Sequence, residues 1–165
     1  MPSLPMKKHL LLCLTIVLSL SKATPSMAQP TEWEKEIVAT CLVLEAANQG
    51  ESGMQAVASV IANRAKGDPS QYLSIVKTPY AFSALIKPTT GKTGEKGFSE
   101  EIARASRDHQ AWPIALKIVD QLYADTLPDN TFGADHYSRR DQLPSWSHGM
   151  RATAVIGDHL FFKRY

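Results

Sequence analysis

The stretch LEAANQGESGMQAVASVIANRA, residues 44–65, joins the end of one apolar segment to the start of another. On both sides of its Asn-Gln-Gly break, apolar residues recur at the spacing of an amphipathic helix. Thr31 with Glu34 forms a candidate capping box at the start of the first segment, and Ser52 with Gln55 does the same for the second. The pattern therefore predicts two helices that begin at these caps and meet at the Asn-Gln-Gly turn.

The remainder of the chain is less regular and changes character near its end. Periodicity predicts a short helix over residues 70–77 and two further helices over residues 99–108 and 112–123. Residues 80–87 are ambiguous between strand and loop, and residues 88–97 are predicted to form a mobile surface loop. Residues 153–163 predict a pair of strands. Helices come first and a small β element follows near the C-terminus. The sequence thus predicts an α+β domain that is mainly α.

Residues 1–28 have the character of an export signal rather than of a folded domain. A basic start precedes an apolar run at residues 10–20, and Ser-Met-Ala at residues 26–28 fits a small-x-small cleavage site. The run is too short for a permanent membrane span, which needs about 20 residues. An uncleaved N-terminal anchor is the alternative. We expect an exported protein, periplasmic or extracellular, with a single domain over residues 29–165.

The charge balance argues against a nucleic-acid-binding surface. The chain carries 18 Lys and Arg against 16 Asp and Glu, and several of the lysines lie in the predicted signal. The remaining domain is close to neutral and lacks the clustered positive charge that binding to phosphates requires. Cys41 is its single cysteine, and apolar neighbours predict a small buried side chain there rather than a nucleophile.

Glu45 is the first candidate for chemistry. It shares a helix face with Cys41 and Leu42, so the sequence predicts that it points toward the apolar side. Burial against apolar walls raises the pKa of a carboxyl, and a carboxyl protonated near neutral pH can act as a general acid. A solvated glutamate at a helix end is the alternative. Glu51 precedes Ser52 at a predicted helix start, where a carboxylate has a structural role.

The histidines leave a second chemistry open. His136, His148 and Asp158 are a conceivable ligand set for a zinc amidase, although no HExxH spacing is present. A simpler interpretation is that hydrogen-bonding residues surround a polar cleft, namely His136 with Tyr137, and also His159. No GxSxG nucleophile motif occurs.

Four segments, taken together, resemble a known family. LEAANQGESGMQAVASVIANRA, YAFSAL, GADHYSRRDQLPSWS and VIGDHLFF are similar to the motifs of the SleB-type cell wall hydrolases, which include spore-cortex-lytic enzymes. The resemblance covers residues 38–162. It is most specific in the combination of Glu45 with Asn63-Arg64 and the closing Ile-Gly-Asp-His.

This resemblance implies a lysozyme-like domain that cleaves the glycan strand of peptidoglycan between N-acetylmuramic acid and N-acetylglucosamine. It implies lytic transglycosylation by Glu45 as the single acid/base, without a metal or cofactor, because the sugar supplies its own nucleophile. The residues expected to contact substrate are Phe82, Ser83, His136, Tyr137 and Trp146. We expect a monomer, with an accessory wall-binding protein as a conceivable partner. The alternatives are a zinc-dependent amidase or peptidase acting on the stem peptide, and a non-catalytic wall-binding protein.

The chain departs from the family pattern in three places. Two more residues than in the pattern separate Glu45 from Glu51. Asp135 stands where the family often has threonine, and residues 87–110 form a longer insertion.

Overall fold

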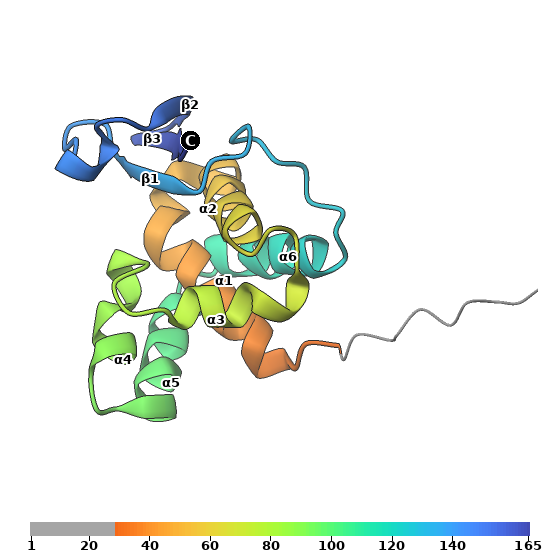
Figure 1. The fold of residues 1–165 in the computed structure, drawn as a ribbon. Coiled ribbons are helices and arrows are strands. Elements are labelled where there is room, and N and C mark those ends of the chain that lie inside the picture. Colours follow the sequence, from red (N-terminus) through yellow and green to blue (C-terminus); the bar gives the residue numbers. More distant parts are fainter. Residues whose placement is uncertain (1–28) are drawn as a thin grey trace, which may run out of the picture.

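The computed structural model describes residues 29–165, which form a helical body with a small three-stranded sheet at one end (Figure 1). The chain passes through the helices first and adds the sheet last, so the predicted α+β, mainly α fold is confirmed. The predicted signal peptide lies outside the described residues. Among residues 29–165, no helix combines the length and the apolar character needed to cross a membrane.

Helix α1 is the centre of the body. It begins at the predicted capping box, in which the Thr31 hydroxyl accepts from the Glu34 amide at 3.3 Å and the Glu34 carboxylate accepts from the Thr31 amide at 2.7 Å. Every residue from 37 to 43 is buried, which is more than one helix face, because other helices surround α1 on several sides. The helices that pack against α1 (Glu32–Ala46) are α2 (Gly50–Arg64), α3 (Tyr72–Lys77), α5 (Gly94–Ala105) and α6 (Ala111–Tyr123).

Helix α2 begins before the predicted capping box at Ser52, and that box is not formed. A 3₁₀ turn, η1 (Ala47–Gln49), follows α1 directly. Gly50, at φ +69°, then redirects the chain into α2. Glycine enters this left-handed region at little cost, so the early start of α2 depends on it. Ser52 lies inside the first turn, where its carbonyl accepts from the Asn130 side chain at 3.0 Å.

Residues 80–97 are largely helical, so the predicted strand or loop and the predicted mobile loop are wrong. After η2 (Pro69–Gln71) and α3, the chain forms η3 (Ser83–Leu85), α4 (Ile86–Thr90) and the start of α5. Pro88 is buried, α4 packs along α5, and Leu85 and Phe98 belong to the main core. Burial of these few apolar side chains outweighs the weak helix propensity of a Gly- and Thr-rich stretch.

The sheet has the strand order β1-β3-β2 with antiparallel pairing throughout. The predicted pair of strands is confirmed, because β2 (Arg151–Ile156) and β3 (His159–Lys163) pair around a turn at Gly157. The sequence does not predict β1 (His136–Arg139), since four residues are too few to show a clear alternation. A further 3₁₀ turn, η4 (Ser145–Ser147), lies between β1 and β2.

A small second core joins the sheet to the body. Phe161 of β3 packs there with Ala56 and Val60 of α2 and with Ala134, which precedes β1. The segment of residues 124–135 runs from the end of α6 back to the start of β1 (Figure 1). The sheet therefore rests on α2, next to the end of α1.

Candidate active site

Glu45 lies in the last turn of α1, where the helix leaves the core, and its side chain is half-buried. Its Oε1 accepts from the Ser83 hydroxyl at 3.0 Å and from the Ala84 amide at 2.6 Å. Its Oε2 accepts from the Tyr137 hydroxyl at 2.8 Å. The sequence predicted apolar walls around this carboxyl, and the structure corrects that prediction. Because α1 ends one residue later, the side chain extends beyond the core to polar donors.

Tyr137 reaches Glu45 from β1, 92 positions further along the chain. Its ring packs against His159 and Phe161 of β3, at centroid separations of 5.1 and 5.6 Å, so the sheet directs the hydroxyl. Burial, and then the negative charge of Glu45, raise the pKa of the Tyr137 phenol well above its ordinary value. The hydroxyl therefore stays protonated and remains a donor to the carboxylate.

The other two donors come from η3, and Phe82 supports that turn from beneath. The Phe82 side chain is only 2% exposed, and the Arg64 guanidinium carbon lies 5.1 Å from its ring centroid. Phe82 is absent from the residues that line the cleft, and its buried ring leaves little surface for the predicted contact with substrate. The Ala84 amide was outside sequence prediction, since a main-chain donor leaves no side-chain signal.

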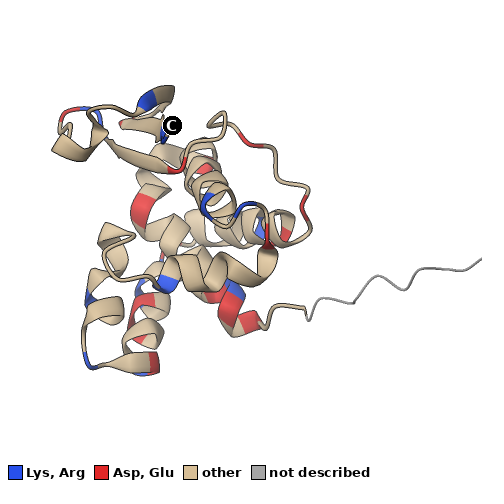
Figure 2. Ribbon diagram, viewed as in Figure 1, with Lys and Arg blue, Asp and Glu red and all other residues tan. Residues whose placement is uncertain are grey.

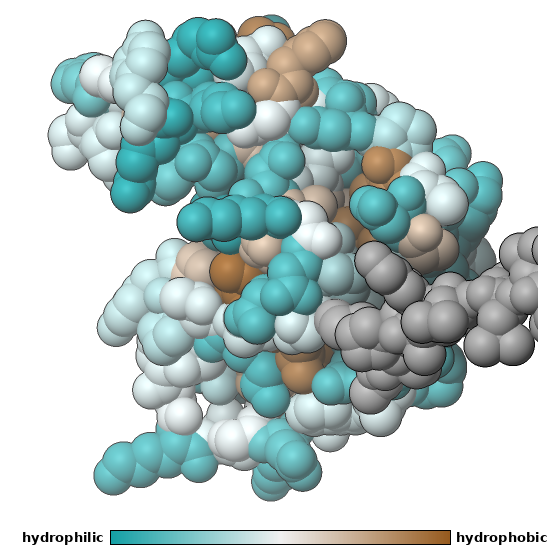
Figure 3. Space-filling model, turned by 45° about the vertical axis from the view of Figure 1, so that its right-hand side comes forward, coloured by the Kyte–Doolittle hydropathy of each residue, from teal (hydrophilic) through white to brown (hydrophobic). Residues whose placement is uncertain are grey.

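A cleft of about 780 Å³ opens at Glu45, between the sheet and the segment that contains η3. Figure 3 shows that the surface is hollowed between the upper and lower lobes of the molecule. The cleft volume falls within the range of about 300–1,000 Å³ that is typical of ligand sites. Polar side chains from both regions line it, among them Gln49, Asp108, Arg139, Asp158 and His159.

Gln49 ties the rim of the cleft to the β2–β3 turn. Its Oε1 accepts from the Asp158 amide at 2.8 Å, and its Nε2 donates to the Asp158 carboxylate at 3.3 Å. Gly157, at φ +56°, permits this approach, because a Cβ at that position would overlap the Gln49 side chain. This role could not be predicted from the sequence, since Asn-Gln-Gly has the composition of an ordinary helix break.

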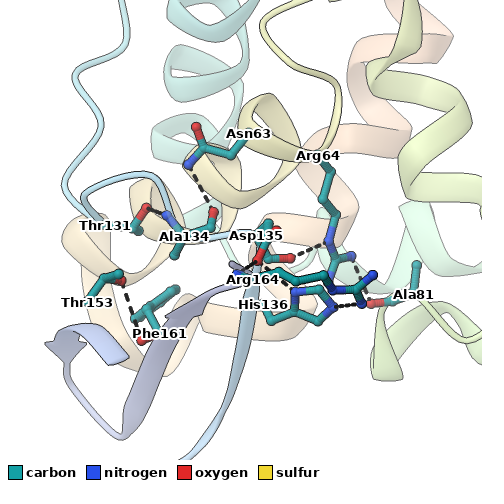
Figure 4. A network of polar contacts seen from close by, with 10 residues as sticks. All are labelled: Asn63, Arg64, Ala81, Thr131, Ala134, Asp135, His136, Thr153, Phe161 and Arg164. Carbon is teal, nitrogen blue, oxygen red and sulfur yellow. Dashed lines mark hydrogen bonds and ion pairs between the residues drawn. The ribbon is translucent and has the colours of Figure 1, made fainter. Parts of the chain in front are cut away.

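Asn63 and Arg64, at the end of α2, hold the segment that leads into β1 (Figure 4). Asn63 Nδ2 donates to the Ala134 carbonyl at 2.9 Å, and Arg64 Nε donates to the Asp135 carbonyl at 2.7 Å. Arg64 also donates from Nη1 to the Ala81 carbonyl at 3.4 Å. One guanidinium thus links the two segments that supply the donors to the candidate acid.

His136 and Trp146 lie apart from the carboxylate, in a second pocket. Their ring centroids are 5.4 Å apart, and Trp146 is 42% exposed. Of the residues predicted to contact substrate, the structure therefore brings Ser83 and Tyr137 to the carboxylate and places His136 and Trp146 in the neighbouring pocket.

Two other candidates from the sequence lie outside the cleft. Cys41 is fully buried, and burial raises the pKa of its thiol well above the ordinary value, so it stays protonated. Glu51 is exposed, and its Oε1 lies 3.7 Å from Lys117 Nζ. It forms a surface ion pair, which agrees with a structural role.

The zinc alternative depends on His136, His148 and Asp158 meeting in space. In the part of the chain that the structure describes, no three His, Cys, Asp or Glu side chains are arranged to hold a metal ion. Asp158 lines the cleft, whereas His136 lines the second pocket. The proposed ligand set is therefore not assembled.

Comparison with known proteins places this geometry in context. Residues 48–162 match the model of a family described as cell wall hydrolases. The fold is similar to the catalytic domain of the SleB protein of Bacillus cereus, with 22% identity, a TM-score of 0.56, and coverage of 83% of this chain and 94% of that one. It is also similar to the catalytic domain of the germination-specific lytic transglycosylase SleB of Bacillus anthracis, with 20% identity, a TM-score of 0.53, and coverage of 83% and 99%.

These matches identify the family and the fold. No curated protein sequence matches the chain significantly. The family match begins at residue 48, after Glu45, so the case for that glutamate depends on the geometry described above.

Proposed function

Because the chain belongs to the cell wall hydrolase family, we propose that it cleaves peptidoglycan, at the glycan strand between N-acetylmuramic acid and N-acetylglucosamine. The observation that carries this proposal is the Glu45 carboxylate at the cleft, oriented by three donors from two distant segments. General acid catalysis requires a carboxyl group held in a defined orientation toward the oxygen that it protonates.

The donors on each carboxylate oxygen indicate where the transferable proton lies. A carboxylate oxygen has two lone pairs. Those of Oε1 are occupied by the Ser83 hydroxyl and the Ala84 amide, whereas Oε2 has one protein donor, Tyr137. We therefore assign the proton of the acid form to Oε2, from which it passes to the bridging oxygen of the leaving sugar.

The reaction we propose is lytic transglycosylation. The bond between the muramyl anomeric carbon and the bridging oxygen breaks as that oxygen takes the Glu45 proton. The resulting carboxylate then accepts the proton of the muramyl 6-hydroxyl, whose oxygen attacks the anomeric carbon and closes a 1,6-anhydro ring. No water is consumed, and Glu45 regains its proton. The similarity in fold to the lytic transglycosylase of Bacillus anthracis supports this route over hydrolysis.

The other carboxylates of the cleft have structural partners, which also supports a single-acid mechanism. Asp108 Oδ1 accepts from the Gln110 and Ala111 amides, at 3.1 and 2.9 Å, where α6 begins. Asp158 is held by Gln49. A double-displacement glycosidase needs a second carboxylate as nucleophile, whereas an attack by the muramyl hydroxyl does not.

We further propose that the protein acts outside the cytoplasm, in the periplasm or at the cell wall. The predicted signal at residues 1–28 supports export, and the proposed substrate lies there. Glu45 and all three of its donors belong to one chain, which supports action as a monomer. Sequencing the N-terminus of the exported protein tests the first point, and it should begin at residue 29.

The test of the activity is mass spectrometry of the soluble products released from purified peptidoglycan. We would compare the mature protein with Glu45→Gln, which keeps the side-chain shape but cannot act as an acid. Glu51→Gln is the matched control, because Glu51 is an exposed glutamate in a surface ion pair. We expect anhydro-muramyl products from the wild type and the control, and none from Glu45→Gln.

Other products would revise the proposal in distinct ways. Reducing muramyl ends that disappear with Glu45→Gln would keep the acid but make the enzyme a hydrolase. Freed stem peptides would indicate an amidase or peptidase. Binding to peptidoglycan without products, unchanged by Glu45→Gln, would indicate a wall-binding protein.

A further inference from the structure

A second pocket, also of about 780 Å³, adjoins the cleft and takes no part in the proposed reaction. The two pockets share Arg64, Ala81 and Tyr137 among the residues that line them. Tyr137 donates to Glu45 on the cleft side, so the second pocket begins within one side chain of the candidate acid. A branched substrate bound at Glu45 would therefore extend into it.

Three cations line the second pocket: Arg64, Lys66 and Arg164. Within residues 29–165, none of their side-chain nitrogens lies within 4.0 Å of a carboxylate oxygen. Arg64 donates to main-chain carbonyls, and Arg164 Nη2 lies 3.4 Å from the His136 ring (Figure 4). The three cations outnumber the acidic residues of the lining, so the pocket has a net positive charge.

Asp135 is the single acidic residue in the lining, and it is already engaged. Its Oδ1 lies 2.8 Å from His136 Nδ1 and accepts from the Arg164 amide at 3.1 Å. Figure 2 shows acidic residues at the start of α1 and also in the segment between α6 and β1 that leads to the sheet. Asp135 can balance one of the three cations, so a net positive charge remains in the pocket.

Two of the lining residues are held in a conformation that side chains normally avoid. Lys66 has φ +54° directly after α2, at a position where glycine is usual, and Tyr80 has φ +62°. The Tyr80 side chain is 75% exposed, and Trp146 is 42% exposed. All three residues, Lys66, Tyr80 and Trp146, line the second pocket, so it combines a cation with two exposed aromatic faces.

We propose that the second pocket binds the peptide branch of the substrate through the carboxylates of that branch. This inference rests on the proposed cleavage of peptidoglycan, in which the stem peptide is joined to the muramyl sugar beside the scissile bond. Stem peptides carry several carboxylates, which match Lys66 and Arg164, and apolar side chains, which match the faces of Tyr80 and Trp146. A glycan without peptides would gain little from these cations. The enzyme is therefore selective for peptide-bearing strands.

The first test compares two substrates: intact glycan strands with their peptides, and the same strands stripped of peptides by an amidase. We expect the wild type to show a kcat/KM at least about tenfold higher on the peptide-bearing strands. The double variant Lys66→Gln/Arg164→Gln should reduce that ratio about tenfold, mainly through KM. Lys96→Gln, an exposed lysine outside both pockets, is the control and should keep the ratio. Equal losses on both substrates would overturn the inference.

The second test does not depend on glycan cleavage. A synthetic stem tetrapeptide is titrated into Glu45→Gln, and the indole N–H signal of Trp146, assigned with Trp146→Phe, is followed by NMR. We expect a saturable shift that weakens with added salt and about tenfold with Lys66→Gln/Arg164→Gln. If the wild type cleaves no glycan but the shift persists, the proposed reaction fails and the pocket stands. If glycan is cleaved and no shift occurs, the pocket assignment fails alone.

Discussion

The helical body and the C-terminal sheet hold the candidate site in different ways. The body buries residues 37–43 of α1 among other helices, so Glu45 stands at the end of its most enclosed element. The sheet meets the body through the small core around Phe161 and through hydrogen bonds from three side chains of the body, Gln49, Asn63 and Arg64.

The candidate acid and its Tyr137 donor are therefore positioned by different parts of the molecule. Packing against the surrounding helices positions Glu45. Tyr137 is held by ring packing within the sheet, and long-range polar contacts attach the sheet to the body. Loosening the sheet should therefore disturb the site while α1 stays folded. Regions held by few buried contacts open more readily than the main core.

Arg64→Met removes the strongest contact between the two regions and should have the largest effect. The Asp135 and Ala81 carbonyls lose a charged donor, and each loss is worth about 1–3 kcal/mol. We expect the free energy of unfolding, from urea denaturation, to fall by about 3 kcal/mol. Amide exchange should accelerate more in β1 than in α1.

Arg107→Met is the control, because Arg107 is exposed. It should change the free energy of unfolding by no more than about 0.5 kcal/mol. Equal acceleration of amide exchange in α1 and β1 by Arg64→Met would mean that the two regions open together, which would contradict their separate stability.

Gly157→Ala disturbs the contact between the β2–β3 turn and the body. The new Cβ would displace Gln49 from the Asp158 amide, and alanine at φ +56° is strained. We expect the free energy of unfolding, measured by thermal denaturation, to fall by about 2 kcal/mol, which is the backbone strain plus the loss of one hydrogen bond. Gly149→Ala isolates the strain, because Gly149 has φ +88° with open space around it, and about 1 kcal/mol is expected there. Equal losses at both positions would show that the Gln49 contact adds nothing.

Tyr137→Phe removes the donor that the sheet supplies to Glu45 while keeping the ring. We expect kcat to fall about tenfold, equivalent to about 1.4 kcal/mol, with KM within about twofold. Ser83→Ala is the counterpart on the body side and should cost only about threefold, because the Ala84 amide still donates to Oε1. An effect of Tyr137→Phe mainly on KM would show that this residue contacts substrate rather than positioning the acid.

His159→Gln tests the pH response of the sheet and should have the smallest effect. Burial lowers the pKa of His159 from its ordinary value of 6.5, against the opposing charges of Glu45 and Asp158 and with a small contribution from Arg139. As the pH falls below 6.5, the unfolded chain gains a proton that the native imidazole does not take up, so stability declines. The decline should be at most about 1 kcal/mol over one pH unit.

His159→Gln should flatten this pH dependence in denaturation curves, and His109→Gln, at an exposed position, is the control. An unchanged slope in His159→Gln would mean that another group carries the response. In that case His159 would pack against Tyr137 without being the source of the pH dependence of stability.

The sequence predicted the fold best where local signals were strong. The capping box at Thr31, the apolar periodicity of α1, α2 and α6, and the β2–β3 pair are all local patterns. It failed at residues 80–97, where the burial of Leu85 and Phe98 by distant helices decides the conformation. It also missed β1, whose pairing with β3 depends on residues about twenty positions away.

Sequence patterns alone predicted helices α1, α2 and α6 and placed Glu45 at the end of α1, whereas Ser83 and Tyr137 became candidates through the resemblance in motifs. These predictions were possible because helix periodicity and motif spacing are properties of neighbouring residues. The folded structure was needed to show that the Ala84 amide completes the donor set, that Phe82 is buried, and that Gln49 and Arg64 hold the site together. Those contacts join residues far apart in the chain, and hydrogen bonds of this kind exist only after the separate elements have packed.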